Sequence, residues 1–312
     1  MEPPLDPPAA IAEPGVAEPV RRTRTPVAAA GLVVVIALMI QTGSALAARL
    51  IDSVGVFDAL WLRTAIAAAV LAAVRPRSLR RPGRGDRLPL LWLTLSLLVM
   101  NLSFYAAIAR APIGIVVAIE FLGPLAVAVL GSRWPLDFVW IMLAGAGVFV
   151  LAGPSGSVGA WGLFFSLLAG AGWAAFLLTA KRAVTSMPPL TVTTLMLAGS
   201  AVLLMPALVV GGGRILDHPS AIWTGVAVAL LSSAVPYVLE LFALSFVRAA
   251  TYGVLLSIEP GIAALTGFLI LDQRLTLEEC AAIAAVAIAA AGASWFDRDV
   301  RERRRAKAEA PS

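Results

Sequence analysis

Ten long apolar runs dominate this sequence, and most of them are separated by only a few residues. A run of about 20 residues is long enough for a helix to cross roughly 30 Å of hydrocarbon. The expected spans are 27–48, 55–74, 88–108, 112–131, 136–153, 159–180, 190–211, 220–243, 249–271 and 276–296. Inside a bilayer every backbone polar group needs a partner within the protein, so these runs should be helical. The predicted fold class is an all-α membrane protein with ten transmembrane helices.

The composition agrees with this class and excludes several others. The 312 residues are 60% hydrophobic and 14% charged, whereas soluble domains are about 45–50% apolar and about 25% charged. The only cysteine, Cys280, rules out an internal disulfide, and the only histidine, His218, rules out a histidine-rich metal site. The sequence contains no Walker motif. Its only histidine, His218, is expected in an outer loop between Asp217 and Pro219, where it cannot complete a Ser/His/Asp triad. We therefore expect no metal, no cofactor and no enzyme activity.

One stretch of the sequence occurs twice. Residues 111–125 read APIGIVVAIEFLGPL, and residues 250–265 read ATYGVLLSIEPGIAAL. Glu120 and Glu259 occupy the same place in the two stretches, 139 residues apart. The repetition predicts two related halves, each containing one membrane helix with a carboxylate near its middle.

The spans divide equally between these halves. The first repeat is expected at 27–153 and the second at 159–296, with five helices each. Because five is an odd number, the second half enters the membrane from the opposite side, which predicts inverted repeats of the kind found in many secondary transporters. Residues 1–26, rich in Pro, Glu and Ala, should form a disordered cytoplasmic tail. Residues 297–312 should form a basic cytoplasmic tail.

The arginines and lysines predict the orientation. With the N-terminus in the cytoplasm, 19 of the 24 basic residues fall on the cytoplasmic side and four fall outside, while Arg63 lies within a span. The excess of basic residues in cytoplasmic loops is the usual rule for membrane proteins. Both termini are therefore expected in the cytoplasm. The same rule explains the basic C-terminal tail without a nucleic-acid partner.

Three charged residues near the middle of their spans are the main candidates for a site. They are Arg63, Glu120 and Glu259, and each costs about 2.5–3.5 kcal/mol on insertion scales unless it finds a partner or water. A buried guanidinium group can bind a substrate carboxylate through two parallel hydrogen bonds. Either glutamate could bind an ammonium group, or could carry a proton, since burial favours the neutral carboxyl form. The alternative is a permanent Arg63–glutamate pair that only holds helices together.

Further polar residues and prolines could complete a cavity. The polar candidates are Asn101, Tyr105, Tyr237 and Ser257, with Gln41, Ser44 and Glu240 as secondary candidates. Pro124, Pro236 and Pro260 lie inside spans. Each proline lacks an N–H group and frees a backbone carbonyl, so helix breaks are expected at these places.

Four segments carry a resemblance to a known family, namely NLSFY at 101–105, VVAIEFLGPLAVAVLGSRWPLDFVW at 116–140, LSSAVPYVLELFAL at 231–244 and SIEPGIAALTG at 257–267. They resemble the drug/metabolite transporter superfamily with two EamA-type repeats. Within the superfamily, the sequence is most similar to bacterial inner-membrane exporters of threonine and homoserine. The resemblance, which runs over 27–296, implies ten helices, cytoplasmic termini and proton-coupled export of small hydrophilic amino acids.

The resemblance leaves two other functions open. One is efflux of drugs or metabolites by a transporter of the same superfamily, which a more aromatic and more apolar cavity would favour. The other is a membrane-embedded enzyme, against which stands the lack of metal ligands and of nucleophile–base pairs in the sequence. The expected partners are a small-molecule amino-acid substrate and the lipid bilayer, and the sequence sets no oligomeric state.

Overall fold

The computed structural model describes residues 26–79, 82–130, 135–153, 158–210, 213–244 and 254–309. These residues are mostly helical, and none of them forms a strand. The first half contains α1 (Pro26–Val54), α2 (Val56–Val74), the 3₁₀ turn η1 (Pro76–Leu79), α3 (Arg87–Ile108), α4 (Ile113–Glu120), α5 (Leu122–Leu130) and α6 (Pro135–Ala152). The second half contains α7 (Ala160–Ser186), α8 (Pro189–Val210), the 3₁₀ turn η2 (Arg214–Leu216), α9 (Ala221–Ala229), the π-helical turn η3 (Leu230–Ala234), α10 (Val235–Leu244), α12 (Glu259–Leu271) and α13 (Leu277–Glu309).

Each of the ten expected spans overlaps helix in the structure. Seven helical segments within the described ranges are long and apolar enough to cross a membrane, namely Gly31–Val54, Val56–Val74, Arg87–Ile108, Ala160–Ala180, Pro189–Val209, Ala221–Leu239 and Val254–Leu271. Two further apolar helices, Ile113–Val127 and Phe138–Ala152, are shorter. The all-helical membrane class is therefore confirmed, while the ten-helix, two-repeat arrangement stays a prediction.

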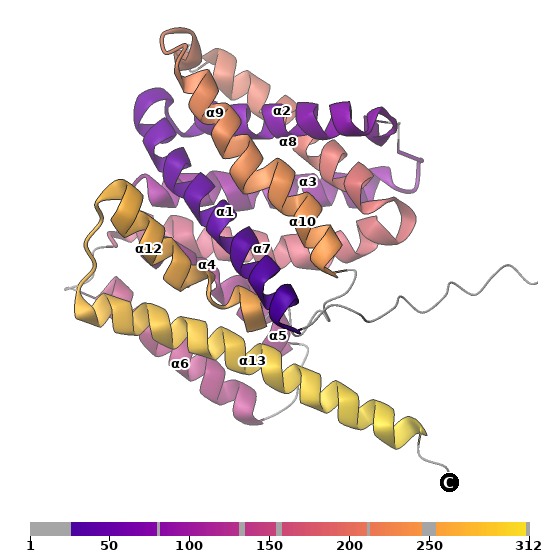
Figure 1. Ribbon diagram of the computed structural model, residues 1–312, viewed down its shortest axis with the longest axis vertical. Coiled ribbons are helices and arrows are strands. Elements are labelled where there is room, and N and C mark those ends of the chain that lie inside the picture. Colours follow the sequence, from indigo (N-terminus) through magenta and orange to yellow (C-terminus); the bar gives the residue numbers. More distant parts are fainter. Residues whose placement is uncertain are drawn as a thin grey trace, which may run out of the picture.

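Helices that are distant in the sequence pack side by side. α3 lies along α7, α2 along α8, and α6 along α13 at the lower edge of Figure 1. α4 packs between α7 and α12, and every residue of α4 is buried. A glycine makes the α4–α12 contact possible, because a Cβ atom on Gly114 would lie 2.7 Å from Ala264 Cα. The short helix that ends at Glu120 is thus enclosed by protein.

Helix irregularities accompany the three prolines at which helix breaks were expected, whereas Pro206 lies inside the regular helix α8. α4 ends at Glu120 and α5 begins two residues before Pro124, the π-helical turn η3 ends two residues before Pro236, and a turn at 257–258 precedes α12, whose second residue is Pro260. Proline has no N–H group and its ring clashes with the carbonyl four residues earlier, which explains why regular hydrogen bonding fails just before each proline.

Some sequence predictions fall outside the described residues. Of the expected N-terminal tail only Pro26 belongs to the structure, as the first residue of α1, and nothing describes the side chain of Glu240. The basic C-terminal segment is described to Glu309, where it continues α13 as a helix that projects past the rest of the bundle (Figure 1).

Candidate functional site

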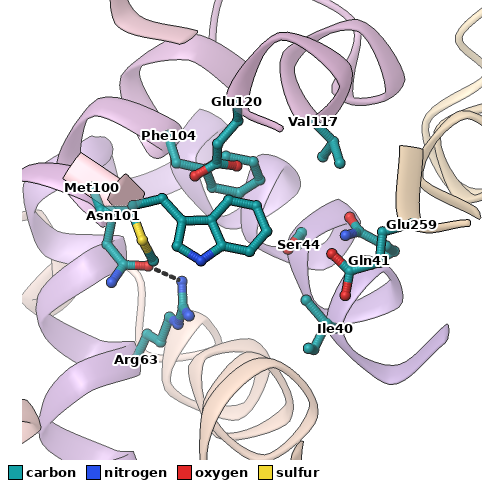
Figure 2. A pocket seen from close by; sticks show the side chains of 11 residues that line it. Ile40, Gln41, Ser44, Arg63, Met100, Asn101, Phe104, Val117, Glu120 and Glu259 are labelled. Atoms are coloured by element: carbon teal, nitrogen blue, oxygen red, sulfur yellow. Dashed lines mark hydrogen bonds between the residues drawn. The ribbon is translucent and has the colours of Figure 1, made fainter. Parts of the chain in front are cut away.

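Within the described residues, a cavity of about 100 Å³ lies among six helices, α1, α2, α3, α4, α7 and α12. Its wall consists of Ile40, Gln41, Ser44, Arg63, Met100, Asn101, Phe104, Val117, Glu120, Trp173 and Glu259 (Figure 2). Both halves of the chain contribute to this wall. Trp173 is fixed by an edge-to-face contact with Phe121, with the ring centroids 5.0 Å apart.

The guanidinium group of Arg63 donates hydrogen bonds to three uncharged oxygen atoms. Its Nε donates to Ser233 Oγ at 2.8 Å, and its Nη1 donates to Asn101 Oδ1 at 2.9 Å. Its Nη2 donates to the carbonyl oxygen of Ser232 at 3.1 Å. The Cζ atom of Arg63 also lies 5.6 Å from the ring centroid of Tyr105, within range of a cation–π contact. These three hydrogen bonds all go to neutral acceptors, so they differ from the arginine–glutamate pair that the helix-lock alternative requires.

The two glutamates of the repeated stretch line the same cavity as Arg63. Glu120 is 7% exposed and Glu259 is 6% exposed, as against 7% for Arg63. In Figure 2 they lie on different sides of the cavity, with Arg63 across from Glu120. Glu120 interacts electrostatically with Arg63 across this space. The structure thus collects three buried ionisable groups from α2, α4 and α12 around one small space.

Three other predicted substrate-binding residues are not part of the cavity wall. Tyr105 is fully buried beside Arg63, and Tyr237 also interacts electrostatically with that guanidinium group. Ser257 is buried and donates to the Val254 carbonyl oxygen at 2.6 Å. None of the three lines the cavity, whereas Asn101, and the secondary candidates Gln41 and Ser44, do reach it.

The sequence analysis missed two residues that contact Arg63. Ser232 and Ser233 lie in the π-helical turn η3, and both provide acceptors for the guanidinium group. Serine is common in membrane helices, so neither residue stood out. The position of Pro236, four residues after Ser232, was the available signal, because a proline there leaves the Ser232 carbonyl without its helical partner.

The described His, Cys, Asp and Glu side chains contain no group of three that could hold a metal ion. What remains at the site is a cationic group, two carboxyl groups, amide and hydroxyl groups, and an aromatic wall. Such a set can bind a small polar molecule, and a carboxyl group among them can bind a proton.

Membrane-length helices around a small ionisable cavity define a membrane transport protein. The comparisons with known proteins agree, since the model of the EamA-like transporter family matches residues 160–295. The chain belongs to the EamA-like transporter family. The threonine/homoserine exporter RhtA of Salmonella typhimurium strain LT2 is 40% identical over 268 residues, covering 84% of this chain and 90% of that protein.

Other relatives extend the comparison. The threonine/homoserine exporter RhtA of Escherichia coli strain K12 is 40% identical over 259 residues, covering 82% of this chain and 87% of that protein. An uncharacterized transporter of Archaeoglobus fulgidus is 26% identical over 212 residues, covering 66% of this chain and 76% of that protein. A protein of known crystal structure shares the fold with a TM-score of 0.63 at 18% identity, covering 88% of this chain and 99% of the other chain.

Proposed function

We propose that this chain exports small hydrophilic amino acids of the threonine and homoserine type across the bacterial inner membrane. The observation that carries the proposal is the cavity that Arg63 shares with Glu120 and Glu259. An amino acid is a zwitterion, so it needs a cationic group for its carboxylate and an anionic group for its ammonium. The names of the relatives with 40% identity support the same class of substrate.

In this proposal Arg63 binds the substrate carboxylate. A guanidinium group has five N–H donors, and hydrogen bonds between the described residues use three of them. Two donors remain, which suits the bidentate recognition of a carboxylate. Glu120 and Glu259 bind the ammonium group or carry the exchanged proton, and Asn101 adds a polar contact. Tyr105 lies beside Arg63, within range of a cation–π contact, and Tyr237 and Ser257 do not line the cavity.

The size of the cavity favours an amino acid over a drug. Its volume of about 100 Å³ is well below the roughly 300–1,000 Å³ of pockets that hold drug-sized ligands. A drug-efflux role would require a much larger space between the same helices.

We further propose that the chain forms two inverted five-helix repeats and works by alternating access with proton exchange. Helix packing supports the repeats. The first expected span of each half packs on the third and fourth spans of the other half. In the first half, α1 contacts α9, α10 and α12. In the second half, α7 contacts α3, α4 and α5. The second, fourth and fifth spans pair with their own counterparts, as α2–α8, α4–α12 and α6–α13. This pattern is unchanged when the halves are exchanged, as a two-fold relation between repeats requires.

Transport by the purified protein tests the function. In proteoliposomes, the wild type should exchange labelled L-threonine and should accelerate this exchange when a pH gradient is applied. The double substitution Glu120→Gln and Glu259→Gln should abolish the acceleration, because a side-chain amide does not bind and release a proton at the pH values of the assay. Glu278→Gln, at an exposed glutamate in the first turn of α13, is the matched control and should behave as the wild type. Unchanged pH-driven exchange in the double variant would contradict the proton-carrying role.

A further inference from the structure

The acceptors that orient Arg63 come from a single irregular turn and one neighbouring helix. Ser232 and Ser233 belong to η3, and Asn101 belongs to α3. Asn101 is itself fixed, because its Nδ2 donates to the Leu97 carbonyl oxygen at 3.0 Å, which leaves Oδ1 for Arg63. Figure 2 shows the resulting Arg63–Asn101 hydrogen bond at the edge of the cavity. Two of the three hydrogen bonds of the guanidinium group thus depend on the shape of η3.

Pro236 explains why the Ser232 carbonyl can accept a hydrogen bond from a side chain. In an α-helix this carbonyl would bind the N–H of the residue four positions later, which is position 236. Proline has no N–H group, so this partner is missing. The preceding N–H, that of Val235, goes to the Leu230 carbonyl oxygen in the wider π-helical pattern. The Ser232 carbonyl is thereby left for Arg63 Nη2 at 3.1 Å.

The π-helical turn is also held against α1. A Cβ atom on Gly43 would lie 2.9 Å from both the backbone N and the Cβ of Ser232, so α1 and η3 are in close contact there. Gly43 lies between Gln41 and Ser44, which line the cavity. The turn is therefore held against the part of α1 that lines the cavity, and π-helical turns occur frequently at functional sites.

We propose that Ser233 and Pro236 are positioning residues: the hydroxyl group of Ser233 and the carbonyl group that Pro236 frees turn the guanidinium group of Arg63 so that its two remaining N–H donors face the cavity. This inference rests on the proposed function, in which Arg63 binds the substrate carboxylate. Substrate binding then depends on η3 in the second half of the chain, although Arg63 belongs to the first half.

Two substitutions test the proposal with two controls. Ser233→Ala removes the acceptor of Arg63 Nε, and Pro236→Ala restores an N–H group that can pair with the Ser232 carbonyl. Ser200→Ala is the control for the serine, since Ser200 is buried in α8 and donates to Met196 of its own helix. Pro206→Ala is the control for the proline, since Pro206 lies inside α8.

The first measurement is independent of transport. In protein labelled with ¹⁵N-arginine, the Nε–H resonance of Arg63 is identified by its loss in Arg63→Lys. Ser233→Ala and Pro236→Ala should shift this resonance and speed its exchange with water, whereas the two controls should leave it unchanged. If the resonance is the same in all four variants, the proposal is wrong whatever the substrate is.

The second measurement is exchange of labelled L-threonine in proteoliposomes. Ser233→Ala and Pro236→Ala should each raise KM about tenfold, the scale expected for a misplaced charged hydrogen-bonding group, with Vmax largely kept. A fall in Vmax at unchanged KM indicates a merely structural role and overturns the proposal. If the wild type itself does not exchange threonine, the proposed function fails, and the NMR measurement alone decides whether these residues position Arg63.

Discussion

At the scale of single residues, the site contains both hydrogen-bonded polar groups and a buried polar atom without a hydrogen-bond partner among the described residues. Arg63 has three neutral acceptors around it, whereas the Oε1 atom of Gln41 is buried without a hydrogen-bond partner among the described residues. Gln41 lines the cavity and is only 3% exposed. A buried acceptor without a donor costs about 1–3 kcal/mol, and a substrate hydroxyl group in the cavity would remove that cost.

Replacing Gln41 should therefore act in opposite directions on stability and on substrate choice. In Gln41→Met the unpaired Oε1 acceptor is gone, so the substrate-free protein should be as stable as the wild type or more stable, by up to about 1–3 kcal/mol. The KM for L-threonine should rise about tenfold, equivalent to about 1.4 kcal/mol, while the KM for 2-aminobutyrate, which has no hydroxyl group, should not change. Thermal unfolding in detergent and competition in proteoliposomes measure the two effects. Equal losses for both substrates would show that Gln41 does not recognise the hydroxyl group.

At the scale of elements, α4 and α12 bring the two repeated glutamates into one cavity. Glu120 is the last residue of α4 and Glu259 is the first residue of α12. The helices can approach closely because Gly114 of α4 faces the backbone of Ala264 of α12. Because Gly114 has no side chain, only the backbone and the Cβ atom of Ala264 set the spacing of the two helices at this point. The distance between the two carboxyl groups depends on this contact.

An added methyl group at this contact should destabilise the protein. In Gly114→Ala the new Cβ would lie 2.7 Å from Ala264 Cα, and because a backbone atom cannot move aside easily, the cost should be about 1–3 kcal/mol. Gly145→Ala on α6 is the control, since nothing lies within 4 Å of a Cβ there, and it should be neutral or stabilising by up to about 1 kcal/mol. Melting temperatures in detergent compare the two. Equal melting temperatures would mean that α4 and α12 can separate without loss.

At the scale of the whole molecule, helix packing crosses between the halves rather than staying within them. α3 packs along α7, α2 along α8 and α6 along α13, and the cavity wall draws on both halves. Neither half could form the site alone. Under the proposed two-fold relation, the two halves would rock between two related states, as alternating access needs.

The orientation in the membrane is a separate prediction at this scale, because it follows from charge alone. In a Cys280→Ser background, a cysteine introduced at His218 should react with a membrane-impermeant maleimide in intact cells, and a cysteine introduced at Ser312 should react only after the membrane is permeabilised. The reason is the large excess of arginine and lysine in the loops assigned to the cytoplasm. Labelling of the cysteine at Ser312 in intact cells would reverse the proposed orientation.

The sequence by itself determined the membrane class, the helical segments and the charged residues of the cavity. Long apolar runs, helix-breaking prolines and intramembrane charges are local properties, and the cost of burying a charge makes Arg63, Glu120 and Glu259 conspicuous without any structure.

Only the tertiary structure decided which groups surround them. Arg63 and Ser233 are separated by 170 residues in the sequence, and their contact depends on how α2 packs against the π-helical turn η3. Tyr105, Tyr237 and Ser257 looked equally suitable in the sequence, yet none of them lines the cavity. A rotation of one residue turns a helical side chain by about 100°, and no local pattern fixes that rotation in a helix that is apolar on nearly every face.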